Sequence, residues 1–183
     1  AGGGGGTSAM AGGLIYLGGG TPVQEACGYH DTPEAMATFL TAACGPETDQ
    51  AKVRAYCEQS VAHFHWFEAH GVPFKRTFYP EPSMEPPTDD CLVFSGGEDA
   101  YPFDRLTPPV PRAHKPQHPN AAGGFLLQRL VAATERSGAA IVTDTRVDTL
   151  VVERDGRVVG VVARHDGGER LVRARDDQRI GVL

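Results

Sequence analysis

The sequence predicts a mixed α/β fold, with helices in the first two thirds of the chain and a three-stranded antiparallel β-meander after them. Apolar residues recur at steps of three and four in separate stretches, which is the pattern of amphipathic helices. Two Asp-Gly turns divide a valine-rich stretch near the end into short segments, as hairpin strands require. Between these regions, a proline-rich stretch with neither period predicts a long irregular segment, which is often functional in a compact domain.

The composition fits one globular domain, or a large part of one, because 40% of the 183 residues are hydrophobic and 22% are charged. The net charge of -6 argues against nucleic acid as a partner. No apolar run approaches the roughly 20 residues that span a bilayer, so we expect no transmembrane segment. The cysteines form no C-x-x-C pair, and we expect reduced, mostly buried thiols in a cytoplasmic protein: Cys27, Cys44, Cys57 and Cys91.

The glycine-rich start, AGGGGGTSAMAGGLIYLGGG, is either a flexible linker or a backbone surface that touches a ligand. The apolar segment LIYL inside it is unusual for a linker. A P-loop is excluded because no lysine precedes Lys52, and no strand lies upstream as a dinucleotide fingerprint demands. The residues alone leave both interpretations open, with a generic nucleotide-binding loop as a third.

The first predicted helix covers residues 31–45, with Asp31 or Thr32 as its N-cap and Pro33 in its first turn. Gly45 ends this helix. The second, over residues 49–71, is expected as one continuous amphipathic helix. Its apolar face consists of Val53, Cys57, Val61, Phe64 and Phe67.

Residues 72–120 form the proline-rich stretch, in which short strands are predicted at 74–80 and 91–96. A third helix is expected over residues 120–138. The meander follows it, with turns at RDGR and HDGG.

Three groups of polar residues are candidates for chemistry. The histidines of HFHWFEAH lack the spacing of a zinc helix, so we expect no metal site. A basic loop before the third helix is either an anion-binding corner or a solvated segment, and the residues do not decide between them: Arg112, His114, Lys115 and His118. Three tyrosines are weak candidates for a proton donor or a ring-stacking group, although ordinary packing would also explain them: Tyr16, Tyr79 and Tyr101.

The order of GGTSAMAGG, YLGGGTPVQEA, PRAHKP and TRVDTLVVERDGRVVGVVA along the chain resembles one family. It is the family of FAD-dependent flavoproteins that contains fumarate reductases, succinate dehydrogenase flavoprotein subunits and 3-ketosteroid dehydrogenases. The resemblance is closest to the ketosteroid dehydrogenase branch. It implies part of an FAD/NAD(P)-binding domain with a partly irregular helical cap.

The resemblance also implies the cofactor contacts. The first part of the loop would run beside the pyrophosphate and ribityl chain of FAD: Gly5, Gly6, Thr7 and Ser8. The second part would follow the isoalloxazine edge, with the two glycines nearest the reactive atoms: Ala9, Met10, Ala11, Gly12 and Gly13. Val147 would touch the adenine side. Backbone N–H groups at that edge would stabilise the negative charge that a reduced flavin gathers.

The implied organisation has four parts: a flavin-contacting loop (1–30), a cap and substrate region (31–120), a return to the FAD-binding domain (121–175) and an atypical tail (176–183). The implied reaction moves a hydride between a substrate carbon and flavin N5, with a steroid-like ketone or a dicarboxylate as substrate. The family's G-x-G-x-x-G unit is missing, and RARDDQRIGVL replaces its next strand, so we expect a fragment without most catalytic residues. The alternative is a non-catalytic remnant that binds no cofactor by itself. Electron acceptor and oligomeric state stay open.

Overall fold

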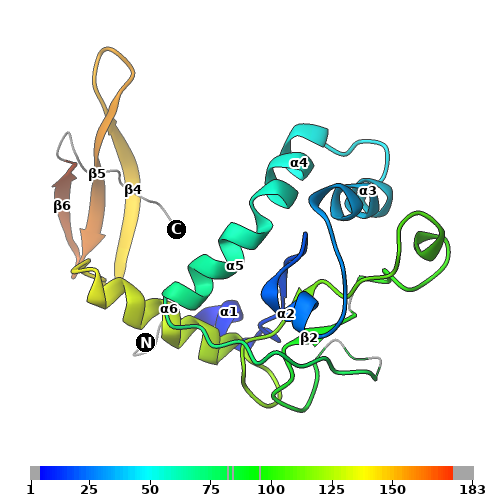
Figure 1. The fold of residues 1–183 in the computed structure, drawn as a ribbon. Helices are drawn as coiled ribbons and strands as arrows, with labels where there is room; N and C mark the ends of the chain where they lie inside the picture. The colour runs from blue at the N-terminus through cyan, green and yellow to red at the C-terminus, as the bar shows by residue number, and fades with distance from the viewer. Residues whose placement is uncertain (1–4, 82, 84, 95, 175–183) are drawn as a thin grey trace. The chain divides into compact units, whose positions relative to one another are not determined.

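The computed structural model describes residues 5–81, 83, 85–94 and 96–174, which form two compact units (Figure 1). The first unit is Gly5–Ala139 and the second begins at Ala140. The first unit contains these helices: α1 (Gly6–Met10), α2 (Pro22–Ala26), α3 (Pro33–Cys44), α4 (Gln50–Glu58), α5 (Ser60–Ala69), the short 3-10 helix η1 (Phe103–Arg105) and α6 (Gly123–Arg136). The mixed fold with an antiparallel meander is confirmed.

Helix α3 begins where the sequence predicts it, and Thr32 is its cap. The Thr32 hydroxyl accepts a hydrogen bond of 3.1 Å from the Ala35 N–H. Asp31, the other candidate, turns inward, and its side chain is fully buried against Arg112. Gly45 ends the helix with a φ of 85°, as expected of a C-terminal glycine.

The prediction of one continuous helix over residues 49–71 is wrong, because α4 ends and α5 begins on either side of Gln59. The apolar spacing is continuous across this point and so gave no sign of the break. Ser60, directly after it, is buried and accepts a hydrogen bond from the Gly18 N–H. Figure 1 shows the two helices in succession.

A three-stranded sheet of two-residue strands lies in the first unit, in the order β1-β3-β2. Its strands are β1 (Ile15–Tyr16), β2 (Leu92–Val93) and β3 (Ala113–His114), all antiparallel to their neighbours. The expected strand at 91–96 shrinks to β2. The one expected at 74–80 is reduced to an isolated bridge between Phe78 and Leu92. Two-residue strands are too short for a period to show in the sequence.

The core of the first unit joins these strands to α5. Phe64 and Leu17 are completely buried, together with Leu92. The aromatic face of α5 therefore packs as the apolar spacing predicts.

Helix α6 begins three residues later than expected, because Asn120 has a left-handed φ of 58° that no helix accommodates. The helix faces α1. Gly138 follows its end with a φ of 81°.

The second unit is the predicted meander, with β4 (Thr145–Val152), β5 (Val158–His165) and β6 (Gly168–Arg173) in that order. Asp166 and Gly167 join β5 to β6 with φ values of 50° and 76°, the two positive angles of a type I′ turn. The atypical tail expected at 176–183 lies outside the described residues. In the described part of the chain, no helix is long and apolar enough to cross a bilayer.

Candidate functional site

The first glycine loop, Gly5–Gly13, is folded onto the start of α6 and is no flexible linker. The Ala11 carbonyl accepts a hydrogen bond of 3.0 Å from the Gly123 N–H, and the Gly12 carbonyl accepts one of 2.9 Å from Ala122. A Cβ at Gly123 would lie 2.3 Å from the Ala11 oxygen, so only glycine allows this approach.

Two glycines of the loop, Gly12 and Gly13, have close neighbours within the chain. Gly13 has a φ of 79°, and a Cβ there would lie 2.6 Å from the Ala122 carbonyl carbon. A Cβ at Gly12 would lie 2.8 Å from Cγ of Glu85. Both positions were expected to face the reactive edge of a cofactor, and that expectation stays a prediction. Close packing against backbone is by itself a sufficient reason for glycine at Gly13, whereas at Gly12 the neighbouring atoms belong to the exposed side chain of Glu85.

The other side of the loop is open. Gly6 has a φ of 45°, and a Cβ there would meet no atom within 4 Å. Thr7, Ser8 and Ala11 are exposed, and Met10 has 84% of its surface accessible. The loop thus presents a rigidly backed strip of backbone, the kind of surface that can follow a flat ligand.

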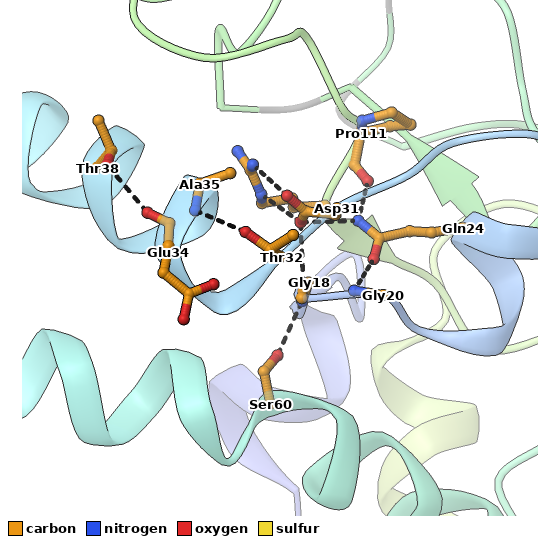
Figure 2. Close-up of polar contacts among 12 residues, drawn as sticks. Gly18, Gly20, Gln24, Asp31, Thr32, Glu34, Ala35, Thr38, Ser60 and Pro111 are labelled. Atoms are coloured by element: carbon orange, nitrogen blue, oxygen red, sulfur yellow. Dashed lines mark hydrogen bonds and ion pairs between the residues drawn. The ribbon is translucent and has the colours of Figure 1, made fainter.

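The second glycine turn, Gly18–Gly20, is held by the buried carboxylate of Asp31, as Figure 2 shows. The Gly19 N–H donates to Asp31 Oδ2 over 2.9 Å, and the Gln24 side-chain amide donates to the same oxygen over 3.3 Å. Gln24 also receives the N–H groups of Gly20 and Thr21 on its Oε1 and donates to the Pro111 carbonyl. This turn therefore has fixed positions for its backbone groups.

Asp31 and Arg112 form an ion pair whose side chains are both fully buried. The guanidinium donates from Nε and Nη2 to the two carboxylate oxygens, over 2.8 and 2.7 Å. A Cβ at Gly18 would lie 2.6 Å from Oδ2 of Asp31, so the glycine turn and the ion pair are packed against one another. Such bidentate pairing is the strong form of this contact.

The interpretation of the basic loop as a solvated segment is wrong, because Arg112, His114 and Lys115 are completely buried. The buried charges of Arg112 and Lys115 face Asp31 and backbone carbonyls within the chain, which disfavours an anion corner. His118, the fourth residue, is partly buried and stacks on Phe125.

Nδ1 of His114 donates to the Arg112 carbonyl, so Nε2 accepts the 2.8 Å bond from the Thr21 hydroxyl. Burial lowers the pKa of His114 to about 4, and the ring is neutral at pH 7.

Lys115 is buried among backbone carbonyls. Its ammonium donates to the oxygens of Pro86, of Thr88 at 2.6 Å and of Asn120 at 3.3 Å. Burial lowers the pKa of Lys115. The three carbonyls tie the proline-rich stretch to the start of α6, which is a structural role.

The three candidate tyrosines occupy different environments. Tyr16 lies in β1 and its hydroxyl is buried beside Glu98 and Arg112. Burial and the Glu98 carboxylate raise the pKa of Tyr16 above its usual value, so its hydroxyl stays a neutral donor. Tyr79 is held through its backbone N–H by the Leu92 carbonyl, and Tyr101 is 83% exposed.

Val147 belongs to the second unit, where it pairs with Ala163 and is half exposed on β4. Asp31, Gln24 and Glu98 are polar residues of the site that sequence reasoning missed. Only Gln24 had a local sign, since it stands three residues after Thr21 and completes a capping box.

The histidines of α5 pack on aromatic rings. His63 stacks on Phe67 at 4.6 Å between ring centroids, and Trp66 stacks on His70 at 4.1 Å. Among the described residues, no three His, Cys, Asp or Glu side chains are placed to hold a metal ion.

The chain is similar to known proteins in both sequence and structure. A family model described as an FAD binding domain matches residues 1–180. The 3-oxo-5-alpha-steroid 4-dehydrogenase of Comamonas testosteroni is 29% identical over 163 residues, which are 86% of this chain and 30% of that protein.

Two solved structures are also similar. One is 3-ketosteroid-delta4-(5alpha)-dehydrogenase from Rhodococcus jostii RHA1, in complex with 4-androstene-3,17-dione. It is 50% identical, with a TM-score of 0.89, over 95% of this chain and 37% of its own. The other is the open conformation of a flavocytochrome c3 fumarate reductase, which is 25% identical with a TM-score of 0.64 over 87% of this chain and 25% of its own.

The chain thus spans between a quarter and two fifths of the length of these relatives. The resemblance inferred from the order of the loops is confirmed, as is the assignment of FAD as the cofactor. By its match over residues 1–180, the chain belongs to the family of FAD-binding domains.

Proposed function

We propose that this chain is the flavin-contacting part of an FAD-dependent oxidoreductase, in which the open side of the Gly5–Gly13 loop lies along the cofactor. The observation that carries the proposal is the one-sided packing of the loop. One side is fixed on α6, while Gly6 and Met10 face open space. A prebuilt backbone strip binds a flat ligand without the entropy cost of ordering a loop.

The residues present fit FAD. Gly6 lies at the start of α1, and a Cβ there would meet no atom within 4 Å, so a phosphate or ribityl oxygen can approach the backbone. Gly5, Thr7 and Ser8 would share this contact, while the strip from Ala9 to Gly13 would run beside the ring. Val147 would meet the adenine side. When bound, FAD supplies a two-electron acceptor for a hydride that leaves a substrate carbon.

We infer a hydrophobic ketone of the steroid class as the substrate, with dehydrogenation of a CH–CH bond as the reaction. Support comes from the 50% identical 3-ketosteroid dehydrogenase, whose structure is a complex with 4-androstene-3,17-dione. A dicarboxylate is the alternative, since a fumarate reductase is similar at 25% identity. The hydroxyl oxygen of Tyr16 is buried beside Glu98 and Arg112, which disfavours Tyr16 as the proton-transfer group among the candidate tyrosines. A cytoplasmic location and the order of loop, cap and return along the chain stay predictions.

The test is a titration of the folded chain with FAD, followed by flavin fluorescence and by co-elution in gel filtration. Gly6→Val places a branched side chain on the open side and is expected to weaken binding at least tenfold. Gly28→Val is the matched control, because Gly28 also has a positive φ of 81° and no atom within 4 Å of a Cβ. It places the same side chain at another glycine of positive φ, away from the strip.

Stoichiometric FAD binding that Gly6→Val weakens and Gly28→Val preserves supports the proposal. A folded chain that leaves FAD free in solution favours the remnant without cofactor. Equal binding by both variants would show that the flavin lies elsewhere.

A further inference from the structure

Glu98 is a buried carboxylate on an otherwise accessible segment. We call Gly96–Leu106 the strap. Among its residues only Glu98 is buried, with 1% of its surface accessible, whereas Tyr101 is 83% exposed and Leu106 is 49% exposed. A glutamate is rarely buried unless a partner holds it there, so this side chain is an anchor for the segment that carries it.

Glu98 contacts, through Tyr16, the buried polar cluster that contains Arg112 and Asp31. The Tyr16 hydroxyl lies beside both the Glu98 carboxylate and the Arg112 guanidinium. Oε2 of Glu98 accepts a 2.9 Å bond from the Gly96 N–H. Its Oε1, the Tyr16 hydroxyl and Arg112 Nη1 are all buried and have no hydrogen-bond partner in the structure.

Arg112 thus has an incomplete polar contact toward Tyr16 and Glu98 and a complete one toward Asp31. Asp31 receives two guanidinium bonds and further bonds from Gly19 and Gln24. Glu98 is held in the cluster by the facing Tyr16 hydroxyl without a well-formed hydrogen bond, whereas Asp31 accepts four, so the Glu98 contact is the weaker of the two. The strap is thus the first part of the cluster to detach.

A second, apolar contact holds the strap at η1. The Phe103 ring meets the Phe39 ring edge-on, with 5.2 Å between centroids. Leu106, at the end of the strap, lines a groove of about 500 Å³ between α3 and α4. Gly97 has a φ of 78° with no atom near its Cβ position, which makes it a suitable pivot at the other end.

We propose that the strap is a hinged cover that pivots at Gly97, and that the contact of Glu98 with Tyr16 is the latch that holds it closed. Opening withdraws Glu98 from the cluster and turns the Tyr16 hydroxyl and Arg112 Nη1 toward solvent. It also moves Leu106 away from the groove. The device involves none of the residues assigned to FAD.

Limited trypsin digestion tests the latch, because Arg105 lies in the strap with 77% of its side chain exposed. Cleavage after Arg105 requires local opening, since a protease needs an extended segment. Tyr16→Phe removes the hydroxyl that faces Glu98, and Glu98→Gln removes its charge. Each is expected to raise the cleavage rate after Arg105 at least tenfold. The matched controls in the strap are Tyr101→Phe and Asp99→Asn, both on exposed side chains, which should cleave as the wild type does.

Amide exchange of the unaltered protein gives a second test that needs no variant. Ala100 and Leu106 donate backbone bonds within the strap. The exchange rates of these two amides should change little at low urea concentrations, because local opening exposes little surface. The exchange rates of the α3 amides should rise with urea, because these amides exchange through global unfolding. Equal urea dependence of strap and α3, or cleavage rates unchanged by both Tyr16→Phe and Glu98→Gln, would overturn the proposal.

Discussion

Removing the charge of Arg112 should destabilise the first unit more than removing the charge of Asp31. The cluster contains one buried cation and two buried carboxylates, Asp31 and Glu98. Arg112→Met leaves both carboxylates buried without a cation. Asp31→Asn leaves one charge of each sign.

Breaking one partner of a buried pair costs about 3–5 kcal/mol. Asp31→Asn is expected to cost about 3 kcal/mol, because the amide oxygen of asparagine still accepts one of the guanidinium bonds. Arg112→Met is expected to cost about 5 kcal/mol or more, because the buried Asp31 carboxylate loses both guanidinium bonds and Glu98 stays buried with no cation in the cluster. Against the total of about 5–15 kcal/mol that stabilises a typical domain, either loss is large.

Urea unfolding followed by tryptophan fluorescence measures these losses directly. Trp66 is the only tryptophan of the sequence and lies on α5, so its signal reports the first unit. Glu68→Gln is the control, because its ion pair with Arg76 is partly exposed and is expected to contribute only about 0–1 kcal/mol. If Asp31→Asn costs more than Arg112→Met, or if both fall in the range of Glu68→Gln, the charge argument is refuted.

Three further predictions concern single groups. His114 has a pKa of about 4 in the folded chain and about 6.5 in the unfolded chain. Its contribution to the free energy of unfolding is therefore complete above pH 6.5 and falls by about 3 kcal/mol toward pH 4. In His114→Gln, the urea midpoint should change less steeply with pH over this window. Iodoacetamide at pH 8 should label the exposed Cys44 first and Cys91 last, since burial raises the pKa of the Cys91 thiol to about 11, and peptide mass spectrometry gives the order. Gly123→Ala should cost about 1–3 kcal/mol through overpacking against the glycine loop. Gly124→Ala should cost clearly less, because its Cβ would lie 3.3 Å from the Ala9 carbonyl oxygen, against 2.3 Å from the Ala11 oxygen for Gly123, and equal costs would contradict the close approach.

The sequence predicts those elements whose determinants are local. The meander follows from two Asp-Gly turns and a valine pattern, and α3 from a cap, a proline and a closing glycine. The Asp31–Arg112 pair joins residues 81 positions apart, and no period or motif marks either as a partner. The basic loop shows the same limit, because three basic residues within four positions resemble a solvated segment until their buried partners are known.

The glycine-rich start of the chain contains two segments with different roles, the loop Gly5–Gly13 and the turn Gly18–Gly20. In the first, Gly13 and Gly123 let two backbones meet, and Gly6 leaves one side open for a ligand. In the second, Gly18 and Gly19 admit a buried carboxylate, so their freedom is used entirely within the protein. Strand β1 joins the two, with only a few residues between loop and turn. The ion pair that fixes the turn therefore also fixes where the loop leaves the core, and a loss of charge there is expected to weaken FAD binding without touching the cofactor strip.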